Sequence, residues 1–290
     1  MRPSADLLGR LGGLRLLGNA PGRSFRQGER RSSAKGAGLE FAGHRAYQEG
    51  DDLRHLDTRL YARLRQPFVR EYLADRQLRV SILIDASASM DFGDPSKRSV
   101  ARMLAGLLAY AGLSSGDLVD VGIAQDNRVN WSDAMQGAPR ADNLFRWINE
   151  ERPEGRMPFA EQLKTAVPRL RAANVAIIIS DWWLEDAEQD MKCLAGLPGQ
   201  VYAIQVTTPE EEDPMLVGRG SLRLADAETG AWLDCVIDPT GAREYAQLLE
   251  KHRQGLQALL KCRGGYILSA RTDMADGELL AALKRGGLLG

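Results

Sequence analysis

The chain has 290 residues, 44% of them hydrophobic and 27% charged, and its formal net charge is −1. These values are typical of an ordinary soluble globular protein with a substantial core, and no apolar run approaches the roughly 18 residues that a membrane-spanning helix needs. The N-terminus also lacks the continuous apolar region of a secretory signal, so we expect a cytoplasmic protein without a membrane span.

The cysteines and histidines indicate neither redox chemistry nor a soft-metal site. Cys193, Cys235 and Cys262 are far apart and odd in number, which argues against a disulfide framework or a zinc knuckle. The three histidines are equally scattered, and nothing local brings them together as a His-based metal site or a Ser-His-Asp triad requires.

The charges are unevenly distributed along the chain. Residues 1–84 contain 16 Lys and Arg against 9 Asp and Glu, and the remainder has an acidic excess. A basic front part could bind nucleic acid, or it could pack against the acidic remainder. We favour packing, because the arginines are interspersed with carboxylates and form no dense cluster.

We expect a basic N-terminal extension, residues 1–78, packed on a main domain of residues 79–290. Residues 1–36 are rich in Gly, Arg and Ser, and glycines weaken a short amphipathic helix at 5–17, so the order of this lead-in stays open. A polar group follows around a turn signal, which we interpret as an ion-paired structural cluster rather than a second polar site. Its two carboxylates are Asp51 and Asp52, and Arg45 and Arg54 flank them.

The stretch from Arg79 to Met90 is the most informative of the chain. An apolar, β-branched run predicts a buried strand that ends at Asp85, and Ser87 and Ser89 follow. One carboxylate and two hydroxyls in a short loop after a strand can face a single point, which suits a hard cation such as Mg²⁺. The alternative is that Asp85 caps the next helix and the serines merely end the strand.

The remaining elements alternate between helix and strand. The second strong buried strand, 173–181, also ends on a carboxylate, Asp181. Alternation of this kind predicts an α/β fold with a mostly parallel sheet and helices on both faces, and ligands bind such sheets beyond the carboxyl ends of the strands. In chain order we predict a helix at 97–113, a strand at 117–124, helices at 142–150 and 159–172, the strand at 173–181, a helix at 186–195, a strand at 201–206, a hairpin of 221–224 and 231–236, a helix at 241–261, a strand at 265–268 and a helix at 276–285.

Two sets of residues resemble known families. Asp85, Ser87 and Ser89, together with Asp181, are similar to the metal-ion-dependent adhesion site of von Willebrand factor A-like domains. The segment from Arg45 to Asp57 resembles the signature of the bacterial DUF58 family, whose positions here are Arg45, Tyr47, Gly50, Asp51, Asp52, Arg54 and Asp57. The two signals occur in the expected order, and the likeness covers most of residues 28–270.

The resemblance implies a three-layer, Rossmann-like von Willebrand A fold with an N-terminal extension and no established enzymatic activity. It also implies a protein partner, either a MoxR-type AAA+ ATPase or its client. Many DUF58 relatives contain two membrane spans before the signature, and this chain resembles the short soluble form.

The same resemblance implies a role for each site residue. Ser87 and Ser89 would be direct ligands of Mg²⁺, and Asp85 and Asp181 would act directly or through water. The motif also requires a threonine where Met157 stands, and a thioether is a poor ligand for Mg²⁺. Either the remaining oxygens hold the metal weakly, or the site is degenerate and Asp85 hydrogen-bonds Ser87 and backbone amides instead.

Three functions follow from these residues. The leading one is a non-enzymatic interaction module, in which an acidic side chain of a partner completes the metal's coordination. A Mg²⁺-dependent phosphoester hydrolase is the second, although Ser87 occupies the second place of the Asp-x-Asp pattern that such an enzyme would need. The third, nucleic-acid binding through the basic N-terminal part, is disfavoured by the dispersed arginines.

Overall fold

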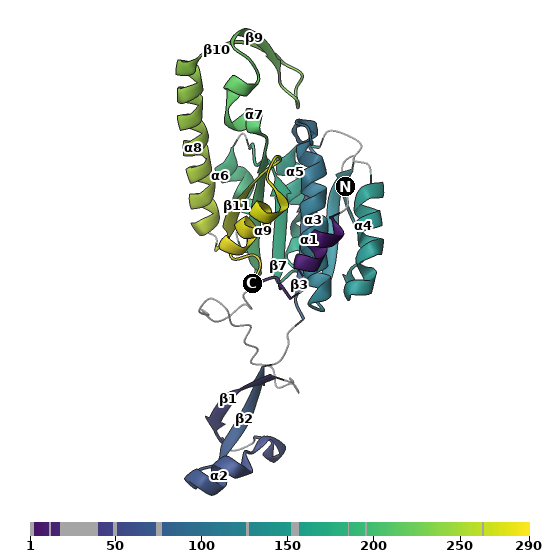
Figure 1. The fold of residues 1–290 in the computed structure, drawn as a ribbon, viewed down its shortest axis with the longest axis vertical. Coiled ribbons are helices and arrows are strands. Elements are labelled where there is room, and N and C mark those ends of the chain that lie inside the picture. Colours follow the sequence, from purple (N-terminus) through teal and green to yellow (C-terminus); the bar gives the residue numbers. More distant parts are fainter. Residues whose placement is uncertain are drawn as a thin grey trace. The chain divides into compact units, whose positions relative to one another are not determined.

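A computed structural model describes residues 3–11, 13–17, 40–48, 51–73, 77–125, 128–151, 157–184, 186–194, 196–262 and 264–290. The chain divides into two compact units (Figure 1). Unit 1 contains residues 1–21 and 78–290, and unit 2 contains residues 22–77.

The main sheet of unit 1 has seven strands in the described part of the chain. Their order is β11 (Tyr266–Arg271), β8 (Gln200–Thr207), β7 (Val175–Ser180), β3 (Arg79–Ile84), β4 (Leu118–Gln125) and β5 (Arg128–Trp131), with β6 (Met135–Gln136) also paired to β4. The strands from β11 to β4 are parallel, and β5 and β6 are antiparallel to β4. This is the strand order of a doubly wound nucleotide-binding sheet, whose order reverses between its first and fourth strands, here β3 and β7.

Helices cover both faces of this sheet (Figure 1). One face is covered by α1 (Ala5–Arg10), α3 (Lys97–Ser114), α4 (Ala141–Glu150) and α9 (Asp276–Arg285), and the other by α5 (Phe159–Leu170), α6 (Ala187–Asp190), the 3₁₀ turn η4 (Met191–Leu194) and α8 (Pro239–Cys262). Successive residues of β7 alternate between the two cores: Ile177 and Ile179 pack in the first, Ala176 and Ile178 in the second. A strand buried on both faces explains the continuous apolar run in the sequence. The predicted α/β architecture is confirmed.

Short elements complete unit 1 at the carboxyl end of the sheet. They are η2 (Ala88–Asp91), α7 (Pro209–Glu212), η5 (Pro214–Leu216) and a separate antiparallel hairpin of β9 (Gly220–Ala225) and β10 (Trp232–Ile237); η3 (Ala138–Arg140) precedes α4.

The first residues of the chain belong to unit 1, which differs from the predicted division at residue 78. Leu7, Leu11 and Leu16 are buried in the first core, and Leu16 forms an antiparallel bridge with Leu289. Ser4 caps α1 by accepting a hydrogen bond from the Leu7 N–H at 3.2 Å. The glycines between these leucines do not prevent the segment from docking, because burial of apolar side chains outweighs helix propensity.

Unit 2 is a two-stranded antiparallel ribbon with a short helix. β1 (Glu40–Ala46) pairs with β2 (Phe68–Leu73), and η1 (Leu53–His55) and α2 (Thr58–Leu64) lie between them in sequence. The backbone N–H of Tyr47 donates to Pro67 at 2.9 Å and extends the ladder beyond Ala46.

The signature residues of unit 2 form local ion pairs. Arg45 binds both carboxylate oxygens of Asp51, each at 2.6 Å, and Asp52 accepts from the backbone and guanidinium of Arg54. Gly50 lies outside the described residues.

Asp57 caps α2 and ties it to the strands. It accepts from the N–H groups of Arg59 and Leu60 at 3.0 Å, and it pairs with Arg70 at 2.8 Å and His44 at 2.9 Å. Arg70 and His44 hold the pKa of this carboxyl well below its ordinary value. The geometry therefore supports the interpretation of a structural cluster.

No helix in the described part of the chain is both long and apolar enough to span a bilayer.

We predict that Asp57→Ala speeds hydrogen exchange in α2 about fivefold, because the variant loses the N-cap of that helix. The same effect should appear in the wild type at acidic pH, since a depressed pKa means that stabilisation is complete above the ordinary Asp value and is lost as pH falls. Mass spectrometry of hydrogen exchange at residues 58–64 measures both effects. Asp52→Ala is the control, because its pair with Arg54 is exposed; equal exchange in both variants would contradict the assignment.

Candidate functional site

The carboxyl ends of β3 and β7 lie next to each other at the centre of the main sheet. Ile84 is paired with Ile179, so Asp85 and Asp181 leave neighbouring strands at the same edge. The backbone N–H of Asp85 continues the ladder to Ile179 at 2.9 Å. The two strand ends that the sequence analysis expected to meet are therefore neighbours, and they meet at the switch point where open α/β sheets bind ligands.

Asp85 is fully buried and accepts several hydrogen bonds. Its Oδ1 accepts from the N–H of Ser87 at 2.8 Å and from the side-chain amide of Gln162 at 3.1 Å. Its Oδ2 accepts from the hydroxyl of Ser180 at 2.6 Å. Burial, and next the charge of Asp181, raise the pKa of Asp85 to about 6, because a low-dielectric site disfavours the charged form.

Ser87 and Ser89 lie in the loop between β3 and α3. Their hydroxyl oxygens are 3.2 Å apart, and Ser87 is buried while Ser89 is half-buried. Arg98 of α3 fixes this loop by donating to the carbonyl oxygen of Ser87 at 3.3 Å and pairing with Asp91 at 2.6 Å. The backbone N–H of Ser89 donates to a carboxylate oxygen of Glu228 at 2.9 Å.

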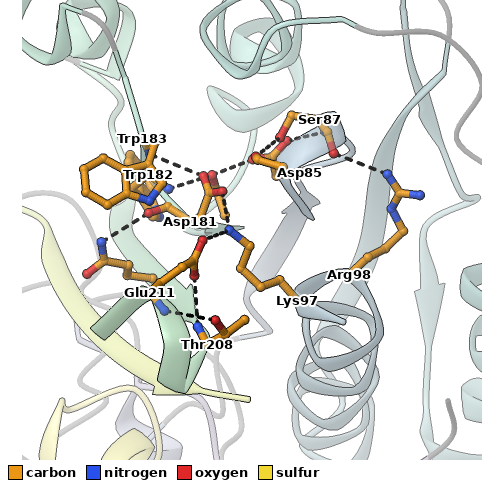
Figure 2. A network of polar contacts seen from close by, with 12 residues as sticks. Asp85, Ser87, Lys97, Arg98, Asp181, Trp182, Trp183, Thr208 and Glu211 are labelled. Atoms are coloured by element: carbon orange, nitrogen blue, oxygen red, sulfur yellow. Dashed lines mark hydrogen bonds and ion pairs between the residues drawn. The ribbon is translucent and has the colours of Figure 1, made fainter. Parts of the chain in front are cut away.

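A buried lysine neutralises Asp181 (Figure 2). Nζ of Lys97 donates to Oδ2 of Asp181 at 2.8 Å and also pairs with Glu211 of α7. Lys97 is 1% exposed and Asp181 2% exposed. The two carboxylates raise the pKa of Lys97 despite the opposing effect of its burial, so the ammonium stays charged.

Lys97 occupies the first position of α3, where a cation opposes the helix dipole. The first turn of α3 contains no acidic residue of its own. The charge of Lys97 is therefore compensated by Asp181 and Glu211, which come from other elements.

The backbone after β7 turns sharply at Trp182, whose φ of 61° is unusual for a bulky residue. Several contacts hold this residue in place. Its N–H donates to the hydroxyl of Ser180 at 3.0 Å, its indole donates to the carbonyl of Ile204 at 3.2 Å, and its ring packs edge-on against Phe159. The turn fixes the direction of the preceding Asp181 side chain, which also accepts from the N–H of Trp183 at 3.3 Å.

Met157 lies in the loop before α5, and Gln162 links its backbone to Asp85. The side-chain amide of Gln162 donates to the carbonyl oxygen of Met157 at 2.8 Å as well as to Asp85, and its oxygen accepts from the N–H of Ala86 at 3.2 Å. The Met157 side chain packs against the first core. A glutamine bridge thus links two segments that a shared metal ion would link in the adhesion-site motif.

The donor set fits Mg²⁺ poorly. Each oxygen of Asp85 accepts a hydrogen bond, Oδ2 of Asp181 is paired with an ammonium, and Met157 replaces the expected threonine. Within the described residues, no group of three or more His, Cys, Asp or Glu is placed to hold a metal ion. A divalent ion placed here would be repelled by Lys97 and would meet mainly two neutral hydroxyls.

The arrangement instead suits an anion. The loop presents a backbone N–H and two hydroxyls, and the negative charge beneath it is reduced by Lys97. Backbone N–H groups and hydroxyls are common ligands of carboxylates. The loop therefore has the chemistry to accept an acidic side chain without a metal ion.

Sequence reasoning missed five contributors to this site, which are Lys97, Gln162, Ser180, Glu211 and Glu228. Only Lys97 had a local signal, because a cation in the first turn of a helix without an acidic neighbour needs an external partner. Ser180 directly precedes Asp181, but its role depends on the pairing of β7 with β3.

A model of the family described as "Protein of unknown function DUF58" matches residues 43–255. The chain belongs to the DUF58 family. The match includes the signature of unit 2 and most of unit 1, so the resemblance to the DUF58 family is confirmed.

Curated relatives of this DUF58 chain are named as uncharacterized proteins. A protein from Mycobacterium tuberculosis is 30% identical over 270 residues, which is 88% of this chain and 83% of the relative. A protein from Mycobacterium avium is 28% identical over 165 residues, 54% of this chain and 96% of that protein.

Solved structures of similar fold include BatB from Bacteroides thetaiotaomicron, with 16% identity and a TM-score of 0.38 over 70% of this chain and 94% of that one. The SpRpn10 VWA domain has 11% identity and a TM-score of 0.41 over 71% and 94% of the two chains. The DUF58 chain has the predicted α/β fold, with a mostly parallel sheet and helices on both faces.

We predict that Asp85→Asn changes how stability depends on pH. With a raised pKa, folded Asp85 keeps a proton that the unfolded chain loses, so the free energy of unfolding falls as pH rises from about 4 to about 6, by on the order of 3 kcal/mol in all. Asparagine does not titrate, so this fall should be absent from the variant's urea denaturation series. Asp234→Asn, on an exposed strand, should retain the wild-type slope; an unchanged slope in Asp85→Asn would contradict the raised pKa.

Lys97→Met should destabilise unit 1 by about 3–5 kcal/mol, because it leaves buried carboxylates without a counter-charge. Adding Asp181→Asn to this variant should restore part of the lost stability, because it removes one of the uncompensated charges. Lys164→Met is the matched control, since its pair with Asp190 is long and half-exposed and should be worth less than about 1 kcal/mol. Thermal and urea denaturation measure these differences, and equal stability of the two single variants would refute the role of Lys97.

Proposed function

We propose that this DUF58 chain is a non-enzymatic protein-interaction module that binds an acidic side chain of its partner at the loop of Ser87 and Ser89. The observation that supports the proposal is the 2.9 Å hydrogen bond from the N–H of Ser89 to the carboxylate of Glu228. It shows that a carboxylate fits this loop sterically. Asp85 and Asp181 would act beneath the loop, the first by anchoring the N–H of Ser87 and the second by holding Lys97.

We further propose that binding does not require Mg²⁺. Of the two alternatives from the sequence, the degenerate site agrees better with the contacts of Asp85, since it accepts from the N–H of Ser87 and from Gln162. Lys97 supplies the positive charge that a metal ion would otherwise provide. The Mg²⁺ site of Asp85, Ser87, Ser89 and Asp181 stays a prediction that the same experiment tests.

The proposed class of partner follows from family resemblance, which points to a MoxR-type AAA+ ATPase or its client. The hydrolase alternative gains no support, because Ser87 still occupies the place of the second carboxylate. Binding of nucleic acid by the basic residues of unit 2 also gains none, since Arg45, Arg54 and Arg70 pair with carboxylates.

The test uses the MoxR-type ATPase of the source organism and biolayer interferometry. Replacing both Ser87 and Ser89 by Ala should weaken binding about tenfold or more, because charge-assisted hydrogen bonds contribute about 1.5–3 kcal/mol each. Binding should be the same in excess Mg²⁺ and in EDTA.

Ser115→Ala is the matched control, because Ser115 follows the opposite end of α3 and bonds only locally to Ala111 in the described structure. Circular dichroism should show an unchanged fold in all variants. Wild-type affinity in the double serine variant would refute the proposed surface, and loss of binding in EDTA would refute metal independence.

A further inference from the structure

The hairpin of β9 and β10 is largely exposed, yet its turn contacts the loop that contains Ser87 and Ser89, called the motif loop below. Trp232 and Leu233 are 66% and 65% exposed, so the strands contribute little to either core. At the turn, Ala227 and Thr229 are exposed, whereas Glu228 between them is half-buried. The contact that buries Glu228 joins it to Ser89, 139 residues away in sequence.

The turn is organised so that Glu228 projects from it. Oδ1 of Asp226 accepts from the N–H of Glu228 at 3.2 Å and from the N–H and hydroxyl of Thr229, both at 2.6 Å. Gly230 follows with a φ of 71°, which glycine adopts without strain. Such side-chain to backbone bonds fix a turn locally, so the position of Glu228 is set within the hairpin itself.

The hairpin strands pair with each other and not with the main sheet. They pair over six residues each in continuous register, from Trp232 opposite Ala225 to Ile237 opposite Gly220. Arg223 bridges to Asp234 at 2.8 Å and lies over the ring of Trp232. The hairpin can therefore leave the motif loop as a unit without breaking its own ladder.

We infer that Glu228 is an internal ligand of the motif loop, which occupies the position of a partner's acidic side chain and must be displaced before the partner binds. The inference rests on the proposed function. An acid on the same chain has a high effective concentration. The apparent affinity for an external acid equals the intrinsic affinity multiplied by the fraction of molecules whose loop is vacant. Because the hairpin strands are already exposed, this displacement uncovers little buried surface.

The experiment follows the amide signal of Ser89 by NMR in the full chain. In the free protein, Glu228→Ala should speed hydrogen exchange at this amide about tenfold, because the amide loses a charge-assisted acceptor. Glu228→Gln should give an intermediate rate, since its amide oxygen still accepts. Unchanged exchange in Glu228→Ala would overturn the inference.

The same signal then reports titration with the peptide acetyl-Gly-Glu-Gly-amide. We expect Glu228→Ala to bind it about tenfold more tightly than the wild type, and we expect no shift with the corresponding Gln peptide. Asp234→Asn, which removes the same charge from the same hairpin, should behave as the wild type. Equal affinity in wild type and Glu228→Ala overturns the inference and leaves the proposed function standing, whereas no shift at Ser89 in either protein overturns both.

Discussion

Two carboxylates at the ends of adjacent parallel strands repel each other in a medium that screens charge poorly, and this repulsion governs the carboxyl edge of the main sheet. The pairing of β3 with β7 fixes how Asp85 and Asp181 are placed, so the surrounding side chains must compensate the two charges. Asp181 is relieved by the ammonium of Lys97. The charge of Asp85 is stabilised by hydrogen bonds, while burial, and next the charge of Asp181, raise its pKa to about 6. Because Lys97 also binds Glu211, one cation joins β7, α3 and α7.

The parts of the site that could be predicted are those with a local pattern. An apolar run followed by a carboxylate placed Asp85 and Asp181 at strand ends, and alternation of helices and strands gave the parallel sheet. Gln162, Glu211 and Glu228 contact residues that are 76, 114 and 139 positions away, and no sequence window contains both partners. The order of α1 was left open, although the extension was expected to pack on the main domain, because glycine-interrupted leucines form a weak helical pattern and the core that buries them is built from distant strands.

The signature of unit 2 shows the opposite organisation. The acids Asp51, Asp52 and Asp57 bind N–H groups and cations that are near them in sequence or directly across a ribbon. Each such acid shapes one turn or one helix start. The signature by which a DUF58 chain is recognised therefore encodes a way of folding, whereas the chemistry of unit 1 depends on contacts that the family motif does not contain.

The bridge between Leu16 and Leu289 has a consequence for the boundaries of the folded domain. Unit 2 is inserted between α1 and β3 in sequence, and the chain then returns to finish a sheet domain that had already begun. A truncated protein that starts at residue 79 would lack Leu7, Leu11 and Leu16 and would expose to water the part of the first core that these side chains cover. Residues 15 and 17 form backbone hydrogen bonds with residues 288 and 290, so the segment before unit 2 and the last residues of unit 1 stabilise each other, and removing either one leaves the other without its partner.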